Sequence, residues 1–170
     1  MKEMIPIITV FISGLFGLIV ALLTWKLANQ REKRKFQIDL YLRELKEKED
    51  LYVSMLANLE KVIRLTRSGQ DYSTLLTELS LNSARANILA SEKINEQLDL
   101  VSDKLYEWSS EFKKGLPTKI GESGFAMISN KDFEHRDSAK ELYPELMTQI
   151  TQLINDVKTE LKESKKQLTE

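Results

Sequence analysis

The chain has 170 residues, of which 42% are apolar and 30% charged, and it contains no cysteine. The lack of cysteine excludes a disulfide scaffold and a cysteine-ligated metal or iron–sulfur centre. The formal net charge of −1 is the sum of two unlike parts, because residues 1–35 hold six Lys/Arg against two Asp/Glu (+4), whereas residues 36–170 hold 19 against 24 (−5). This asymmetry, together with an equally uneven apolar content, excludes a uniform globule.

The first predicted element is an apolar helix over residues 5–25, preceded by a tail of residues 1–4. Of its 21 residues, 15 are apolar and none is charged. At about 1.5 Å per residue this helix is about 31 Å long, which matches a hydrocarbon core of about 30 Å. A cleaved signal peptide is disfavoured, because its apolar region would be about 7–15 residues long. We therefore expect a single-pass transmembrane anchor.

A basic juxtamembrane segment, residues 26–35, follows the predicted anchor and holds five of the six basic residues of the N-terminal part. By the positive-inside rule the N-terminus lies outside the plasma (inner) membrane and the C-terminal domain lies in the cytoplasm. The basic side chains would also contact anionic lipid headgroups. Nucleic-acid binding is disfavoured, since no further basic patch follows. The residues predicted to set topology and contact headgroups are Trp25, Lys26, Arg31, Lys33, Arg34 and Lys35.

Small residues recur every four positions within the predicted anchor, at Thr9, Ser13, Gly17 and Ala21. This spacing places them on one helix face, where a second helix can approach closely. The pattern predicts a helix–helix contact in the membrane, made by a homo-oligomer or with another membrane protein. No ionisable residue within the span marks a conduction pathway.

Residues 36–114 are predicted to form a long helical hairpin with a turn at 68–72. Between Leu18 and Lys114 the sequence has one glycine, Gly69, and no proline. A possible new helix start at Ser91 would kink the second arm and divide the bundle into four segments. The first apolar stripe, of coiled-coil spacing, is interrupted at Glu49, which would set the register or face a gap. The first stripe comprises Ile38, Leu42, Leu45, Tyr52, Leu56, Leu59 and Ile63, and the second comprises Ile94, Leu98, Val101, Leu105, Trp108 and Phe112.

The third predicted bundle helix covers residues 138–168, with Ser138 and Glu141 as a capping box and Pro144 near its start. Its apolar face comprises Leu142, Leu146, Ile150, Leu153, Val157 and Leu161. Strand patterns are essentially absent. We therefore predict an all-α fold, in which an N-terminal transmembrane helix continues into an antiparallel three-helix cytoplasmic bundle.

The connection at residues 115–137 is long for a helical bundle. If the second arm runs straight back along the first, opposed positions sum to about 140, which brings Trp108 and Phe112 to the level of residues 28–36. The connection would then lie beside the headgroups. Its apolar residues are candidates for contact with the membrane or a partner: Ile120, Phe125, Met127 and Ile128.

No catalytic, cofactor-binding or metal site is predicted. His135 lies among acidic residues of the connection, but consecutive loop residues rarely converge on a metal ion. We predict a membrane-tethered, non-enzymatic helical-bundle interaction or scaffold protein, acting through self-association and a cytoplasmic protein partner. The first alternative is a homo-oligomeric membrane effector of the pore-forming, toxin or defence type. The lower alternative is an enzyme with an interhelical carboxylate site, for which Glu49 and Glu96 are candidates.

Overall fold

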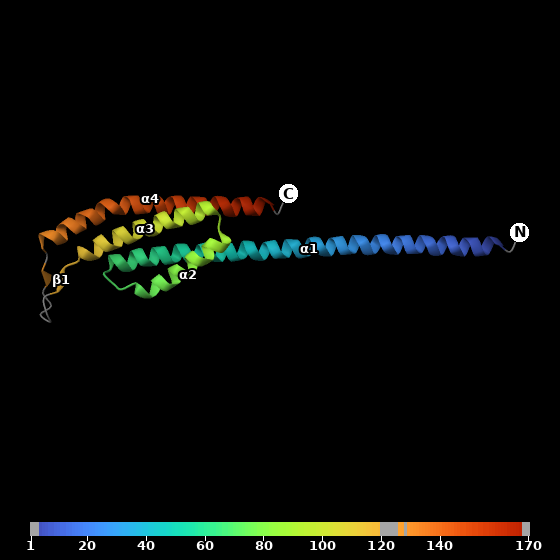
Figure 1. Ribbon diagram of the computed structural model, residues 1–170, viewed down its shortest axis with the longest axis horizontal. Coiled ribbons are helices and arrows are strands. Elements are labelled where there is room, and N and C mark those ends of the chain that lie inside the picture. Colours follow the sequence, from blue (N-terminus) through green and yellow to red (C-terminus); the bar gives the residue numbers. More distant parts are fainter. Residues whose placement is uncertain (1–3, 120–125, 128, 168–170) are drawn as a thin grey trace. The chain divides into compact units, whose positions relative to one another are not determined.

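The computed structural model describes residues 4–119, 126–127 and 129–167, and the side chains of residues 16–117, 127 and 129–166. The chain divides into two compact units, Met1–Glu44 and Leu45–Glu170. The elements follow in the order α1 (Met4–Arg67), α2 (Ser73–Leu89), α3 (Glu92–Lys114), β1 (Thr118–Lys119), β2 (Ala126–Met127) and α4 (Asn130–Gln167) (Figure 1).

The first unit consists of the N-terminal part of α1. Its backbone is helical from Met4 onward. The hydroxyl of Thr24 donates to the carbonyl of Val20 at 2.8 Å, a back-bond that satisfies a polar side chain within the helix itself. Over the residues that the structure describes, no helix is both long enough and apolar enough to cross a membrane. The side chains of residues 5–15, which belong to the predicted anchor and include Thr9 and Ser13, lie outside the described residues.

The second unit is a helical bundle, and its first reversal follows the end of α1. Gly69 has a φ of +67°, which favours glycine. Its N–H donates to the carbonyl of Thr66 and the N–H of Gln70 donates to that of Leu65, both at 3.0 Å. These two bonds form a Schellman motif, which satisfies the last carbonyls of the helix. The Asp71 carboxylate then accepts from the backbone N–H and hydroxyl of Ser73, where α2 begins.

The second arm of the predicted hairpin, residues 73–114, is divided into two helices, because the chain reverses a second time at Ala90 and Ser91. Both residues are extended, with ψ of 161° and 157°. Two consecutive extended residues end one helix and redirect the next. Figure 1 shows α2 and α3 running in opposite directions. Among its described residues the bundle therefore has four helical segments, and Ser91 marks a full reversal where the sequence suggested a kink.

The last helix begins earlier than predicted. α4 starts at Asn130, eight residues before Ser138, and Pro144 lies inside it. The Ser129 N–H donates to Asp132 Oδ2 at 2.7 Å, and the Asp132 N–H donates to Ser129 Oγ at 3.3 Å. This reciprocal pair is a capping box, so the box lies at Ser129–Asp132 and the assignment to Ser138–Glu141 is wrong. Ahead of it, β1 and β2 form a two-residue antiparallel ladder that the sequence did not indicate.

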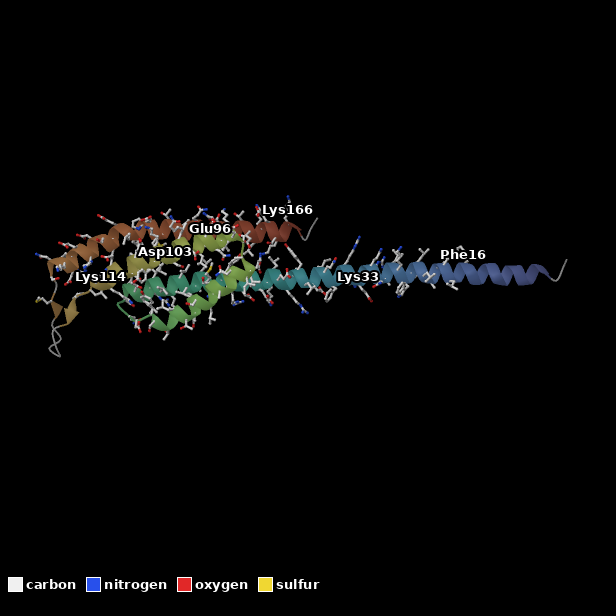
Figure 2. The ribbon with its side chains drawn as sticks, in the orientation of Figure 1. Phe16, Lys33, Glu96, Asp103, Lys114 and Lys166 are labelled. Atoms are coloured by element: carbon white, nitrogen blue, oxygen red, sulfur yellow. The ribbon has the colours of Figure 1, made fainter. Side chains whose placement is uncertain are left out.

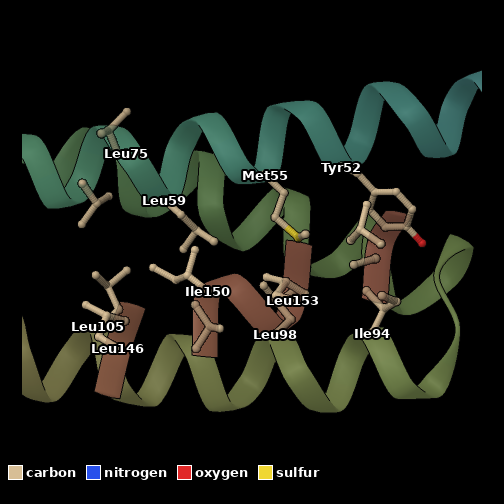
Figure 3. Packing of buried hydrophobic residues seen from close by; sticks show 14 of the residues in the cluster. Tyr52, Met55, Leu59, Leu75, Ile94, Leu98, Leu105, Leu146, Ile150 and Leu153 are labelled. Carbon is tan, nitrogen blue, oxygen red and sulfur yellow. The ribbon is translucent and has the colours of Figure 1, made fainter. Parts of the chain in front are cut away.

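All four of the described helices contribute to one apolar core. Figure 3 shows Leu59 of α1 and Ile150 of α4 meeting across it, with Leu98 of α3 close to Leu153 of α4. The α3 stripe is buried as predicted, apart from Phe112, which is partly buried. On α1 only part of the predicted stripe is buried, namely Leu45, Tyr52 and Leu59. Leu56 and Ile63 are partly buried, and Ile38 and Leu42 are exposed. The additional buried residues of α1 are Leu51, Met55 and Val62.

Candidate functional sites

Apolar side chains are exposed around the described N-terminal part of α1. Phe16 is 68% exposed, Leu22 56% and Trp25 67%. Intervening apolar residues, Leu18 to Val20 among them, are also exposed, so the apolar surface extends around the helix circumference. A helix that is apolar on every side is typical of a protein interior or a membrane. Figure 2 shows these side chains projecting from α1, with Phe16 labelled.

The predicted headgroup residues follow directly along the helix. Their basic side chains are all exposed, and Lys33 is labelled in Figure 2. Two residues of the predicted packing face, Gly17 and Ala21, lie in the part of α1 whose side chains the structure describes, and Ala21 is exposed. A Cβ added to Gly17 would meet nothing within 4 Å. The helix surface at Gly17 is therefore open to a neighbouring helix.

The predicted contact residues of the connection are only partly described. Met127 lies in β2 and is 61% exposed. Ile120, Phe125 and Ile128 lie outside the described residues. The connection begins beside the C-terminal end of α1, where Leu116 Cδ1 is 3.7 Å from the position of a Cβ on Gly69. Because α2 and α3 are separate helices that run in opposite directions, the straight second arm that would bring the connection beside the headgroups is not present.

A polar junction joins three parts of the bundle at Glu160 of α4. Its Oε1 accepts from Lys48 Nζ at 3.0 Å and from the hydroxyl of Tyr52 at 2.8 Å, both on α1. Its Oε2 accepts from the Ser91 hydroxyl at 2.6 Å and from the Ser91 N–H at 3.3 Å. The Glu160 side chain is 14% exposed. One carboxylate therefore connects α1, the α2–α3 reversal and α4.

The surroundings of Glu160 keep its carboxylate charged, which favours the ion pair with Lys48. Burial by itself raises the pKa of Glu160, but hydrogen bonds from Ser91, Lys48 and Tyr52 outweigh it and lower the pKa overall. The pKa of Tyr52 is raised, mainly by burial and further by its hydrogen bond to the negative Glu160. Tyr52 therefore stays a neutral donor and Glu160 a charged acceptor. A charged acceptor with a neutral donor is suited to a structural role in holding helices together.

Other polar contacts link α3 to α4. Lys93 Nζ lies 2.5 Å from Asp156 Oδ1, and hydrogen bonds from Lys93 and Gln152 lower the pKa of Asp156. His135 Nδ1 lies 2.6 Å from Glu111 Oε2. Within the described residues, no group of three or more His, Asp or Glu side chains is arranged to hold a metal ion. His135 instead joins the start of α4 to the end of α3.

The two carboxylates suggested for an interhelical catalytic site lie in ordinary structural surroundings. Glu49, which interrupts the first stripe, forms an ion pair with Lys165 of α4 at 2.5 Å. Glu96 is exposed on α3. These surroundings give neither side chain a site in which an acid or base would be set apart from water.

A cavity of about 460 Å³ lies at the end of the bundle where α1 and α3 finish and α4 begins. Its wall combines aromatic rings with basic side chains. The sequence did not indicate this cavity, because its residues come from segments far apart in the chain. They are Arg67, Trp108, Phe112, Gly115, Leu116, Phe133, Arg136, Asp137, Ala139, Lys140 and Tyr143.

Comparison of the chain with protein-family models, with curated proteins and with solved structures found no match.

Proposed function

We propose that the protein is a membrane-tethered, non-enzymatic interaction protein. The observation that carries this proposal is the exposed apolar surface of α1 from Phe16 to Leu27, followed by exposed basic side chains up to Lys35. Exposed apolar surface of this extent is costly in water and is stabilised in lipid. The sequence supports the same proposal, since residues 5–25 contain no charge. In this proposal residues 5–25 are the anchor and residues 26–35 contact anionic headgroups.

The bundle would present its outer surface to a cytoplasmic protein. Its helices are held together by an apolar core and by the Glu160 junction, which supports a fixed shape rather than a moving one. Several large apolar side chains remain on its outside. Single exposed apolar residues are ordinary, so these are candidate contact points and do not define a patch. They include Val53, Leu76, Ile88, Leu100 and Tyr106.

Topology is testable with single cysteines, because the chain has none of its own. Lys2→Cys and Asp103→Cys place one thiol near the N-terminus and one on the exposed face of α3. With a membrane-impermeant maleimide, Lys2→Cys should be labelled in intact cells and Asp103→Cys only after permeabilisation. Both variants should stay in the membrane pellet after alkaline carbonate. Release by carbonate would refute the anchor, and the opposite labelling would refute the orientation.

Self-association through the small-residue face has a separate test. Gly17→Leu adds bulk at a position with open space around it, so α1 itself tolerates the change. If the face packs against a second helix, the substitution should weaken association in a membrane reporter assay by at least several-fold. Leu18→Phe adds bulk on another side of the helix and serves as the control. Equal association in both variants would remove self-association through this face from the proposal.

A further inference from the structure

We propose that the cavity at the end of the bundle is a binding site for a small anion that carries an aromatic ring. Its volume of about 460 Å³ is within the range of small-molecule sites. Three helices contribute to its wall, namely the last residue of α1, the end of α3 and the first turns of α4. All of its lining residues belong to the bundle unit, so the site is independent of the membrane anchor.

The charge of the wall favours an anion. Three of its side chains are basic, Arg67, Arg136 and Lys140, and one is acidic, Asp137. Lys140 Nζ lies 2.8 Å from Asp137 Oδ1, so these two charges largely offset each other. In the part of the chain that the structure describes, no ion pair involves either guanidinium. The wall therefore has an excess of positive charge, although Asp132, whose pKa is lowered chiefly by hydrogen bonds from Ser129 and also by Arg136, offsets part of the charge of Arg136.

One guanidinium lies over an aromatic ring. The Cζ of Arg67 lies 4.3 Å from the centre of the Tyr143 ring. Stacking on an aromatic ring uses the flat face of a guanidinium and leaves its in-plane N–H groups available. Such N–H groups bind carboxylate, sulfonate and phosphate groups with two parallel hydrogen bonds. Arg67 is thus prepared to receive an acidic group.

Aromatic rings form the apolar part of the wall. Trp108 is 2% exposed, and its ring centre lies 5.5 Å from that of Phe112 and 5.7 Å from that of Tyr143. These separations are typical of packed aromatic pairs. Phe133, at the start of α4, is 52% exposed and leaves a ring face available. The cavity therefore places aromatic rings beside cationic side chains, which suits a ligand that has both an aromatic ring and a negatively charged group.

The close approach of α3 and α4 that shapes the cavity depends on Gly115. A Cβ at this position would lie 2.7 Å from Arg136 Cγ and 3.0 Å from the Arg136 backbone nitrogen. Real Cβ atoms do not approach other atoms so closely, so a side chain here would push the start of α4 away. The missing side chain lets Arg136 lie directly against the end of α3.

The test uses isothermal titration calorimetry on the full chain in dodecylmaltoside micelles, with empty micelles as the blank. Three probes separate ring from charge: 2-naphthalenesulfonate has both, 2-naphthalenemethanol has only the ring, and methanesulfonate has only the charge. We expect saturable one-to-one binding of 2-naphthalenesulfonate, at least five-fold weaker binding of the neutral ring, and no saturation with methanesulfonate.

Variants locate the site. Arg67→Gln and Arg136→Gln should each weaken binding of 2-naphthalenesulfonate at least five-fold. Arg85→Gln removes the same charge from an exposed position on α2 and should leave binding unchanged. Far-UV circular dichroism identifies a variant that fails to fold. In that case the affinity of the other arginine variant for 2-naphthalenesulfonate tests the site. Absence of saturable binding, tighter binding of the neutral ring, or equal affinity in all three variants would overturn the proposal.

Discussion

Removing the Glu160 carboxylate should destabilise the bundle strongly for a single polar side chain. Glu160→Ala takes away the acceptor of Lys48, Tyr52 and Ser91 at once. The three donors differ in their access to water once the carboxylate is removed. The hydroxyl of Tyr52, a residue only 1% exposed, is left without its acceptor, whereas Lys48 and Ser91 reach water.

The expected magnitude follows from that difference. A buried donor without a partner costs about 1–3 kcal/mol. The partly exposed ion pair with Lys48 and the exposed Ser91 hydrogen bond add about 0.5–1 kcal/mol together. Glu160→Ala should therefore lower the free energy of unfolding by about 1.5–4 kcal/mol, the sum of these contributions. Adding Tyr52→Phe removes the orphaned hydroxyl, so the double variant should be about 1–2 kcal/mol more stable than the sum of the single effects.

Urea unfolding followed by tryptophan fluorescence measures this effect. The chain has two tryptophans, and Trp25→Phe leaves Trp108, buried in the bundle, as the reporter. Glu163→Ala is the matched control, because Glu163 lies three residues further on α4 and is exposed. If the loss in Glu160→Ala is within about 0.5 kcal/mol of that in the control, Glu160 does not stabilise the bundle beyond an exposed residue, since exposed substitutions commonly reach that size.

Three further predictions concern the turns and acid stability. Gly69→Ala should cost about 1 kcal/mol in urea unfolding, because φ is +67° while the added Cβ makes only an ordinary 3.7 Å contact; an unchanged midpoint would contradict this. Gly115→Ala should cost about 1–3 kcal/mol with no backbone strain, because its Cβ would overlap Arg136; crosslinking between α3 and α4 should report the displacement. The pKa values of Glu160 and Asp156 are lowered in the folded state, so their stabilisation is complete above about pH 4.5 and is lost as the pH falls through their folded pKa values. Urea midpoints from pH 6 to 3 should therefore fall, and less steeply in Glu160→Gln; parallel curves would show that Glu160 plays no part.

Local patterns predicted the helices but located their ends unevenly. The α3 stripe from Ile94 to Trp108 is buried in the structure, because regular apolar spacing places these side chains on one helix face. The start of α4 was misplaced, since Ser129–Asp132 and Ser138–Glu141 both resemble capping boxes and only the folded chain distinguishes them. At Ser91 the sequence indicated a helix start, but a helix start does not specify the direction in which the new helix runs.

The candidate sites also differ in how far the sequence could predict them. The apolar stretch and the basic segment are contiguous in the chain, so composition alone identified them. The Glu160 junction and the cavity near Arg67 and Trp108 are assembled from three separate segments each. No spacing rule connects residues whose contact depends on how helices pack. Sequence reasoning therefore missed both.

The helical character of the chain, and the difference in charge and apolarity between its N-terminal part and the rest, can be predicted from residue order alone, because helix periodicity and composition are local properties. Tertiary packing places the second reversal at Ala90–Ser91 and the start of α4 at Asn130. It also decides which carboxylate joins the helices and where rings and arginines meet. Those features depend on which helix faces bury one another, and burial is a property of the whole folded chain.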